Sequence, residues 1–186
     1  MKSAGVTQLN TFNNNWYKPG KSFAVKSLWY ITNSILLKSG IPGSAWRRIL
    51  LKLYGAKMGK DVVLKPRINI KYPWKLEVGD YSWIGEQVWI DNLDLVVIGK
   101  NCCISQGAFL LCGNHNYKSP AFDLTIAPIT LEDGVWIGAK SVVVPGVVCK
   151  DHSILTVGSI ATKNLESYGI YSGNPAEKIR ERTIEG

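Results

Sequence analysis

The sequence predicts an all-β solenoid preceded by a short helical region. From Met58 onward an apolar residue recurs every six positions, and a glycine often follows it, as in Ile84-Gly85 and Ile98-Gly99. A period of six fits neither an α-helix of 3.6 residues per turn nor the alternation of a simple strand. It fits short strands joined by tight turns and wound so that equivalent side chains stack along one axis. In such a solenoid each layer is stabilised by burial against the next.

The repeat runs through most of the chain and is interrupted at length only once. Its leading apolar positions are Met58, Leu64, Ile70, Val78, Ile84, Ile90, Ile98, Ile104, Leu110, Leu131, Ile137, Val143, Cys149, Leu155 and Ala161. The long interruption, Leu110–Pro128, holds His115, one of only two histidines in the chain. A regular scaffold that breaks at a histidine favours an active-site loop. The other histidine, His152, lies in the turn of a regular repeat and is expected at the surface.

The composition is that of an ordinary globular domain. The 186 residues are 46% hydrophobic and 19% charged, which argues against a disordered chain and against a membrane bundle. The start MKSAGVTQLN is not a signal peptide, and the four cysteines, Cys102, Cys103, Cys112 and Cys149, form no CxxC pair. We therefore expect a cytoplasmic protein with reduced thiols.

The charge is concentrated in the first third of the chain. Residues 1–55 contain eight basic and no acidic residues, whereas the other 131 residues contain 14 of each. The whole net charge of +8 therefore belongs to residues 1–55, which predicts a part with a role of its own.

This first third is predicted to form an arm and two helices. Residues 1–20 are polar and rich in Asn, and are expected to be extended. The spacing predicts a helix over 21–37, a break at Ile41-Pro42-Gly43, and a second helix from Ser44, with Ser44 as its N-cap. The predicted apolar stripe of the first helix is Ala24, Leu28, Ile31 and Ile35, widened by Trp29, Tyr30, Leu36 and Leu37. That of the second is Trp46, Ile49, Leu50 and Leu53, with Arg47, Arg48 and Lys52 off the stripe.

Two roles of the helical region stay open at this point. The helices could only cover one end of the solenoid, or their basic surface with Trp and Leu could also rest peripherally on an anionic membrane. No uninterrupted apolar run approaches the roughly 20 residues that span a bilayer. Nucleic acid is not an expected partner, because no recognition motif accompanies the charge.

Four segments carry a resemblance to a known family. They are KYPWKLEVGDYSWIGEQVWIDNL (71–93), CISQGAFLLCGNHNYKSPAFDL (103–124), LEDGVWIGAKSVVVPGV (131–147) and YSGNPAEKIRER (171–182). The chain resembles the hexapeptide-repeat acyltransferases, and among them the sugar O-acetyltransferases of the galactoside, maltose and nodulation-factor type. It is most similar to the colanic-acid acetyltransferase branch.

The resemblance implies a left-handed parallel β-helix with three six-residue faces per coil. It also implies three parts, which are a basic helical region over 1–55, a β-helix acetyltransferase domain over 56–166 with an active-site loop at 111–128, and a tail over 167–186 that helps to bind the cofactor. Coils then begin at positions 58, 78, 98, 131 and 149, and every residue beyond the ideal coil length follows a third face. All insertions therefore lie at one edge of the prism.

That layout brings a few polar residues together. Stacked strands lie about 4.8 Å apart, so Asp91 and Asn92 are expected one layer below the loop that carries Asn114 and His115. The resemblance implies that His115 is the general base, a task that suits the ordinary pKa of histidine. It places Asp91, Asn92, Asn114 and Tyr117 as candidate acceptor contacts, although Asp91-Asn92 could also be turn residues.

The resemblance further implies a homotrimer that binds acetyl-CoA between its subunits, with no metal. Trp136 would lie beside the cofactor arm, and Gly138 with the backbone N–H of Ala139 would face the thioester oxygen. The nucleotide end would be held by Thr162, Lys163, Asn174, Pro175, Lys178 and Arg180. The chain departs from its relatives at Glu177, where they often carry Arg. Direct transfer needs no covalent intermediate, so no cysteine nucleophile is expected.

The predicted function is therefore acetyl-CoA-dependent O-acetylation of a sugar in a polysaccharide precursor, either free or lipid-linked. An N-acetyltransferase acting on an amino sugar or amino acid and a non-catalytic β-helix are the alternatives. A γ-type carbonic anhydrase needs three histidine ligands for its metal, and the chain has only His115 and His152.

Overall fold

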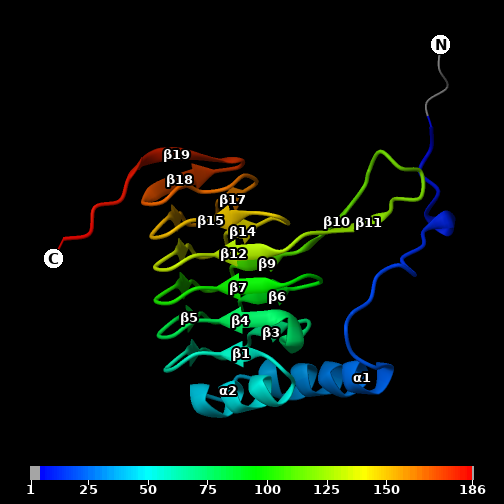
Figure 1. The fold of residues 1–186 in the computed structure, drawn as a ribbon, viewed down its shortest axis with the longest axis horizontal. Helices are drawn as coiled ribbons and strands as arrows, with labels where there is room; N and C mark the ends of the chain where they lie inside the picture. The colour runs from blue at the N-terminus through cyan, green and yellow to red at the C-terminus, as the bar shows by residue number, and fades with distance from the viewer. Residues whose placement is uncertain (1–4, 186) are drawn as a thin grey trace.

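The computed structural model describes residues 5–185 and shows a parallel β-solenoid with helices at one end (Figure 1). Three parallel sheets form its sides. The first contains β1 (Lys57–Met58), β4 (Leu76–Val78), β7 (Val96–Ile98), β12 (Ile129–Leu131) and β15 (Val148–Cys149). The second contains β2 (Val63–Leu64), β5 (Trp83–Ile84), β8 (Cys103–Ile104), β13 (Trp136–Ile137) and β16 (Ile154–Leu155). The third contains β3 (Asn69–Ile70), β6 (Trp89–Asp91), β9 (Phe109–Leu111), β14 (Val142–Val143) and β17 (Ile160–Ala161).

The register of the sheets confirms the six-residue repeat. Val78 pairs with Ile98, and Ile98 with Leu131, so residues at the same repeat position stack directly in successive coils. Of the predicted leading residues, all except the half-buried Met58 lie in the core. Coils approach so closely that a Cβ on Gly79 would lie 2.6 Å from the carbonyl carbon of Gly99, which explains the glycine after the leading residue.

The three insertions lie at the edge between the third and first sheets, as predicted. The first contains the short helix η3 (Pro73–Lys75), and the second covers residues 92–95. The third is much the longest and projects from the prism as a hairpin of β10 (Gly113–His115) and β11 (Leu124–Ile126) (Figure 1). At the far end, β18 (Gly169–Gly173) and β19 (Ala176–Glu181) extend the second sheet.

The other end of the solenoid is covered by α1 (Phe23–Thr32), the π-helical turn η2 (Asn33–Leu37) and α2 (Ser44–Leu53). Two details of the prediction are wrong here. The first helix is interrupted at Asn33, and Gly43 rather than Ser44 occupies the N-cap of α2. The Ser44 hydroxyl instead exchanges hydrogen bonds with the backbone of Leu64, because α2 packs directly on β2. Within residues 5–185, no helix has the length and apolar character needed to cross a membrane.

The orientation of both helices also differs from the expected one. In the first, Trp29 and Leu37 are buried, whereas the predicted stripe around Leu28 and Ile35 faces away from the solenoid. The Trp29 indole donates a hydrogen bond to the Ile70 carbonyl at 3.0 Å, which fixes that rotation. Periodicity identifies the residues that share one helix face, but it does not determine which face packs.

Residues 5–22 form the predicted extended arm, with one short turn, η1 (Leu9–Thr11). The arm lies near the β10–β11 hairpin at its N-terminal end and runs along the solenoid to the start of α1 (Figure 1). It is fastened by the Trp74 indole, which donates to the Pro19 carbonyl at 2.6 Å, and by the Tyr17 hydroxyl, which donates to the Leu93 carbonyl at 2.7 Å. The arm is therefore part of the folded domain.

Candidate active site

The β10–β11 hairpin positions His115. Its strands pair Gly113 with Ile126 and His115 with Leu124, so the histidine ends a hydrogen-bonded ladder instead of lying in an irregular loop. The strands continue directly from β9 in the solenoid wall, which anchors the base of the hairpin. The hairpin therefore holds His115 in a fixed position beside the solenoid.

The imidazole of His115 is held in one tautomer. Its Nδ1 lies 2.7 Å from the carbonyl oxygen of Phe122, and a carbonyl can only accept, so Nδ1 carries the hydrogen. The ring also stacks on Phe122, with centroids 4.5 Å apart and planes at 11°. In the neutral imidazole this places the lone pair on Nε2, which is the arrangement that a general base requires.

The N-terminal arm reaches this histidine. The ring of Phe12 lies 5.8 Å from that of His115, and the backbone N–H of Gln8 donates to the Pro120 carbonyl at 2.8 Å. No local pattern in the sequence indicated this contact, because about a hundred positions separate its partners and only the folded chain brings them together.

A cavity of about 1040 Å³ lies between the arm, the hairpin and the third sheet. Asp91, Asn114 and His115 all line it, so the structure brings three of the predicted residues together. The arm contributes further side chains that the sequence did not identify, which are Phe12, Asn14, Asn15, Tyr17, Lys18 and Lys21. The cavity thus combines a histidine, a carboxylate and several amide and ammonium groups.

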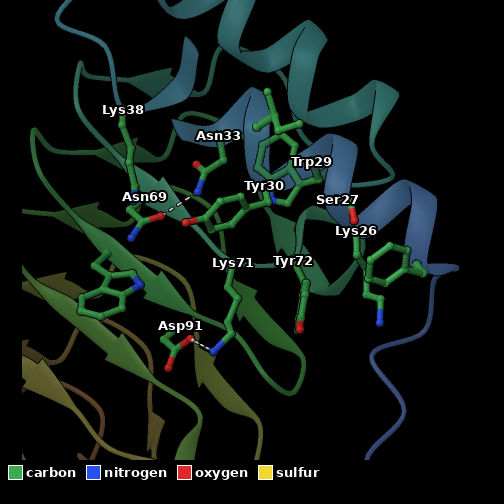
Figure 2. Close-up of a pocket in the computed structure, with 13 residues that line it drawn as sticks. Lys26, Ser27, Trp29, Tyr30, Asn33, Lys38, Asn69, Lys71, Tyr72 and Asp91 are labelled. Carbon is green, nitrogen blue, oxygen red and sulfur yellow. Dashed lines mark hydrogen bonds and ion pairs between the residues drawn. The ribbon is translucent and has the colours of Figure 1, made fainter. Parts of the chain in front are cut away.

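Asp91 is the acidic group of this cavity. It ends β6 and pairs with Leu111 of β9, so it lies one layer below the hairpin, as predicted. The Lys71 ammonium is 2.8 Å from its Oδ1, although the angles do not form a hydrogen bond (Figure 2). Its side chain is only 13% exposed, and its Oδ1 is buried without a hydrogen-bond partner among the described residues.

Two other predicted acceptor contacts lie outside the cavity. Asn92 is fully buried, and its amide donates to the Tyr72 and Lys75 carbonyls while accepting from the Tyr72 N–H, so it holds the preceding insertion in place. Tyr117 is 77% exposed at the tip of the hairpin. The structure therefore places Asn92 away from the expected acceptor position, because its amide already makes its hydrogen bonds to the backbone of the chain.

Gly113 offers a test of how strictly the hairpin is positioned. A Cβ at this residue would lie 2.5 Å from Cδ1 of Leu93, so Gly113→Ala is expected to displace the hairpin and to lower activity about tenfold or more. Steady-state kinetics of Gly113→Ala and of the double variant with Leu93→Ala check this. The double variant should recover activity, because removing the Leu93 side chain relieves the clash; equal activity of Gly113→Ala and the unaltered protein would contradict it.

The predicted cofactor residues lie elsewhere on the chain. Trp136 of β13 is 46% exposed on the second sheet, where its indole donates to the Ser105 hydroxyl at 3.0 Å. Gly138 is buried and Ala139 half-buried in the turn that follows. None of these three lines the cavity of His115, so one chain does not bring the candidate base and the candidate oxyanion donor into a single cleft.

The remaining cofactor candidates lie towards the end of the solenoid opposite the helices. Thr162 and Lys163 are exposed just after β17, and Asn174 with Pro175 forms the exposed turn between β18 and β19. Arg180 is exposed on β19, and Lys178 pairs with Glu181 at 2.6 Å. Exposed cations at this end suit a phosphate-bearing group.

The cysteines do not supply a reactive thiolate at the site. Cys112 immediately precedes the hairpin but is buried, and burial raises the pKa of its thiol to about 12. The thiol therefore stays protonated near neutral pH, and a protonated thiol is a poor nucleophile.

Comparison with known proteins places this geometry in context. No protein-family model matches the chain. The chain is 36% identical over 166 residues to the putative colanic acid biosynthesis acetyltransferase WcaF of Escherichia coli (strain K12), covering 89% of this chain and 91% of that protein. It is also 29% identical over 138 residues to the galactoside O-acetyltransferase of Escherichia coli (strain K12), covering 73% and 68%.

Solved structures share the fold. A hexapeptide-repeat containing acetyltransferase from Vibrio cholerae O1 biovar eltor, complexed with acetyl coenzyme A, has a TM-score of 0.78 at 20% identity and covers 87% of this chain and 88% of that one. A maltose O-acetyltransferase from Clostridium difficile 630 has a TM-score of 0.78 at 18% identity, covering 88% and 90%. With the stacked six-residue coils and the near-complete match to WcaF, these likenesses show that the chain belongs to the hexapeptide-repeat acetyltransferase family.

Proposed function

We propose that the chain is an acetyl-CoA-dependent O-acetyltransferase, and that it acetylates a sugar hydroxyl of a polysaccharide or lipid-linked oligosaccharide precursor. The observation that carries this proposal is His115, which lines a large polar cavity and has its Nδ1 hydrogen-bonded to the Phe122 carbonyl, so that Nε2 is the nitrogen left to accept a proton. The names of the relatives support it, since they include a putative colanic acid biosynthesis acetyltransferase and a galactoside O-acetyltransferase.

The reaction follows from the tautomer of His115. The acceptor hydroxyl donates its proton to Nε2 as its oxygen attacks the thioester carbon of acetyl-CoA. The Phe122 carbonyl stabilises the imidazolium that forms, because it already accepts the hydrogen on Nδ1. When the carbon–sulfur bond breaks, the thiolate of CoA takes the proton from Nε2, so the products are the acetyl ester and CoA.

The walls of the cavity suit a sugar. Asp91 would accept a hydrogen bond from a second hydroxyl, and Asn114, exposed beside His115, would bind another. The ring of Phe12 next to His115 offers an apolar face to the C–H groups of the sugar. These groups would orient one hydroxyl towards Nε2.

The donor side of the site would come from a second copy of the chain. Trp136 and the N–H of Ala139 lie on a different side of the prism from the hairpin, so a homotrimer that packs these sides together would complete each site. In that arrangement the Ala139 N–H would stabilise the oxyanion of the tetrahedral intermediate.

The proposal is tested by incubating the protein with acetyl-CoA and a panel of acceptors while free CoA is followed with a thiol reagent. The panel contains neutral oligosaccharides, lipid-linked oligosaccharides and amino sugars. We expect release of CoA that depends on a hydroxylated acceptor, and an acetylated product that mild alkali returns to the starting sugar. Release without an acceptor, or an alkali-stable acetamide as the product, would overturn O-acetylation.

A further inference from the structure

The outer surface of α1 and η2 is apolar although it does not contact the rest of the chain. Leu28, Ile31 and Ile35 are 57%, 53% and 66% exposed, and their spacing places them on one side of the helix. A helix in water ordinarily turns such a stripe towards the core. In this chain the stripe faces outward, while Trp29 faces the solenoid with only 2% exposed.

The second helix likewise exposes apolar side chains of its predicted stripe. Ile49 and Leu53 are 61% and 78% exposed, whereas Arg47 is fully buried. Between residues 23 and 53, nine large apolar side chains are exposed: Leu28, Ile35, Leu36, Ile41, Ile49 and Leu53, together with Phe23, Tyr30 and Ile31, which also line a groove beside β3 and β6. We call this surface, at the helical end of the solenoid in Figure 1, the end platform. A concentration of exposed apolar side chains on two neighbouring helices indicates a binding surface.

The charge around the end platform indicates its partner. Residues 1–55 contain no Asp or Glu, and Lys52 is exposed on α2 next to Leu53. Apolar side chains among cations suit the boundary between acyl chains and anionic headgroups. A second copy of the chain suits the surface less well, because it would bring two uncompensated positive surfaces together.

We propose that the end platform docks this protein onto the surface of an anionic phospholipid membrane. The apolar side chains of α1, η2 and α2 enter the headgroup region, and Lys52 contacts lipid phosphates. The docking needs neither acetyl-CoA nor an acceptor.

The position of the platform relates it to the candidate site. A groove of about 630 Å³ runs between α1 and strands β3 and β6, where Tyr30, Lys38 and Lys71 face it (Figure 2). It shares Lys26, Lys71, Tyr72 and Asp91 with the cavity of His115, so the two lie side by side. His115 follows β9, two layers from β3, or about 10 Å along the axis. This step rests on the proposed function: an acceptor anchored in the same membrane could then extend along the groove to His115.

The docking is tested by flotation of the full chain with vesicles. One set contains phosphatidylglycerol in phosphatidylcholine, and the other contains phosphatidylcholine alone. We expect binding to the anionic set, weaker binding to the neutral set, and at least a tenfold loss of binding for the variant Leu28→Asp with Ile35→Asp. The matched control is Ile179→Asp on β19, since Ile179 is 58% exposed at the opposite end and should bind as the unaltered protein does.

Three results would overturn the docking: no binding of the unaltered protein to anionic vesicles, equal binding to neutral ones, or equal loss in the Ile179→Asp control. A fourth contrary result would come from light scattering without lipid: the unaltered chain would self-associate through the stripe and would not bind vesicles. Should Leu28→Asp with Ile35→Asp fail to fold, the serine pair replaces it. Because the assay contains no donor or acceptor, its failure leaves the proposed acetyl transfer untouched, and an inactive enzyme that binds vesicles leaves the docking untouched.

Discussion

Replacing His115 with alanine is expected to lower kcat by about 10²–10⁴-fold while the solenoid stays folded. The imidazole lies on a projecting hairpin and is only half-buried, so its removal leaves no large void in the core. The loss should appear in kcat more than in KM for the acceptor, because the base acts as the hydroxyl is deprotonated and the cavity walls still bind the sugar. Steady-state rates of CoA release over a range of acceptor concentrations measure both constants.

The chain contains a matched control for this experiment. His152 lies in a turn of the regular repeat, with φ at 57° and its ring 4.9 Å from that of Tyr168. Asparagine tolerates this left-handed backbone, so His152→Asn should fold and retain full activity. If His115→Ala retained the rate of the unaltered protein, the proton acceptor would have to lie elsewhere, and the O-acetyltransferase mechanism proposed for this cavity would be wrong.

The solenoid could be predicted in detail because its signal is repeated. Each coil presents the same pattern, and the stacking of Val78, Ile98 and Leu131 follows from their equal place in successive repeats. The insertion edge followed from counting coil lengths, and it correctly placed Asp91 below the hairpin of His115.

The rest of the candidate site depends on contacts that leave no local trace. The contact of Phe12 with His115 joins residues that are distant in sequence. The buried amide of Asn92 binds the backbone of Tyr72 in the preceding coil. Asn92 was expected in the cavity because an Asx residue beside a carboxylate looks the same in sequence whether it binds a ligand or a neighbouring backbone.

The helix faces show a further limit of sequence patterns. Arg47 was expected outside because helical spacing places it off the predicted apolar stripe. Its guanidinium instead donates to the carbonyls of Gly43 at 2.7 Å, Ser39 at 3.4 Å and Ile41, all in the turn between the helices. Burial lowers the pKa of Arg47, and the three carbonyls accept from its two terminal nitrogens while Nε is buried without a partner among the described residues. The arginine thus holds the turn together from within.

Arg47→Met is therefore expected to lower the free energy of unfolding by about 2–4 kcal/mol, because it removes the hydrogen bonds that a buried guanidinium donates to three carbonyls. Methionine keeps the length and helix propensity of the side chain, so the loss reports mainly the missing hydrogen bonds. Urea unfolding followed by tryptophan fluorescence measures it, since Trp29 and Trp46 both lie in these helices. Lys52→Met in the same helix is the control: Lys52 is exposed, so its change should stay within about 0.5 kcal/mol. Equal stability of the two variants would mean that the turn does not need the hydrogen bonds of Arg47. Apolar contacts such as those of the buried Leu51 would then be sufficient to hold α2 against the solenoid.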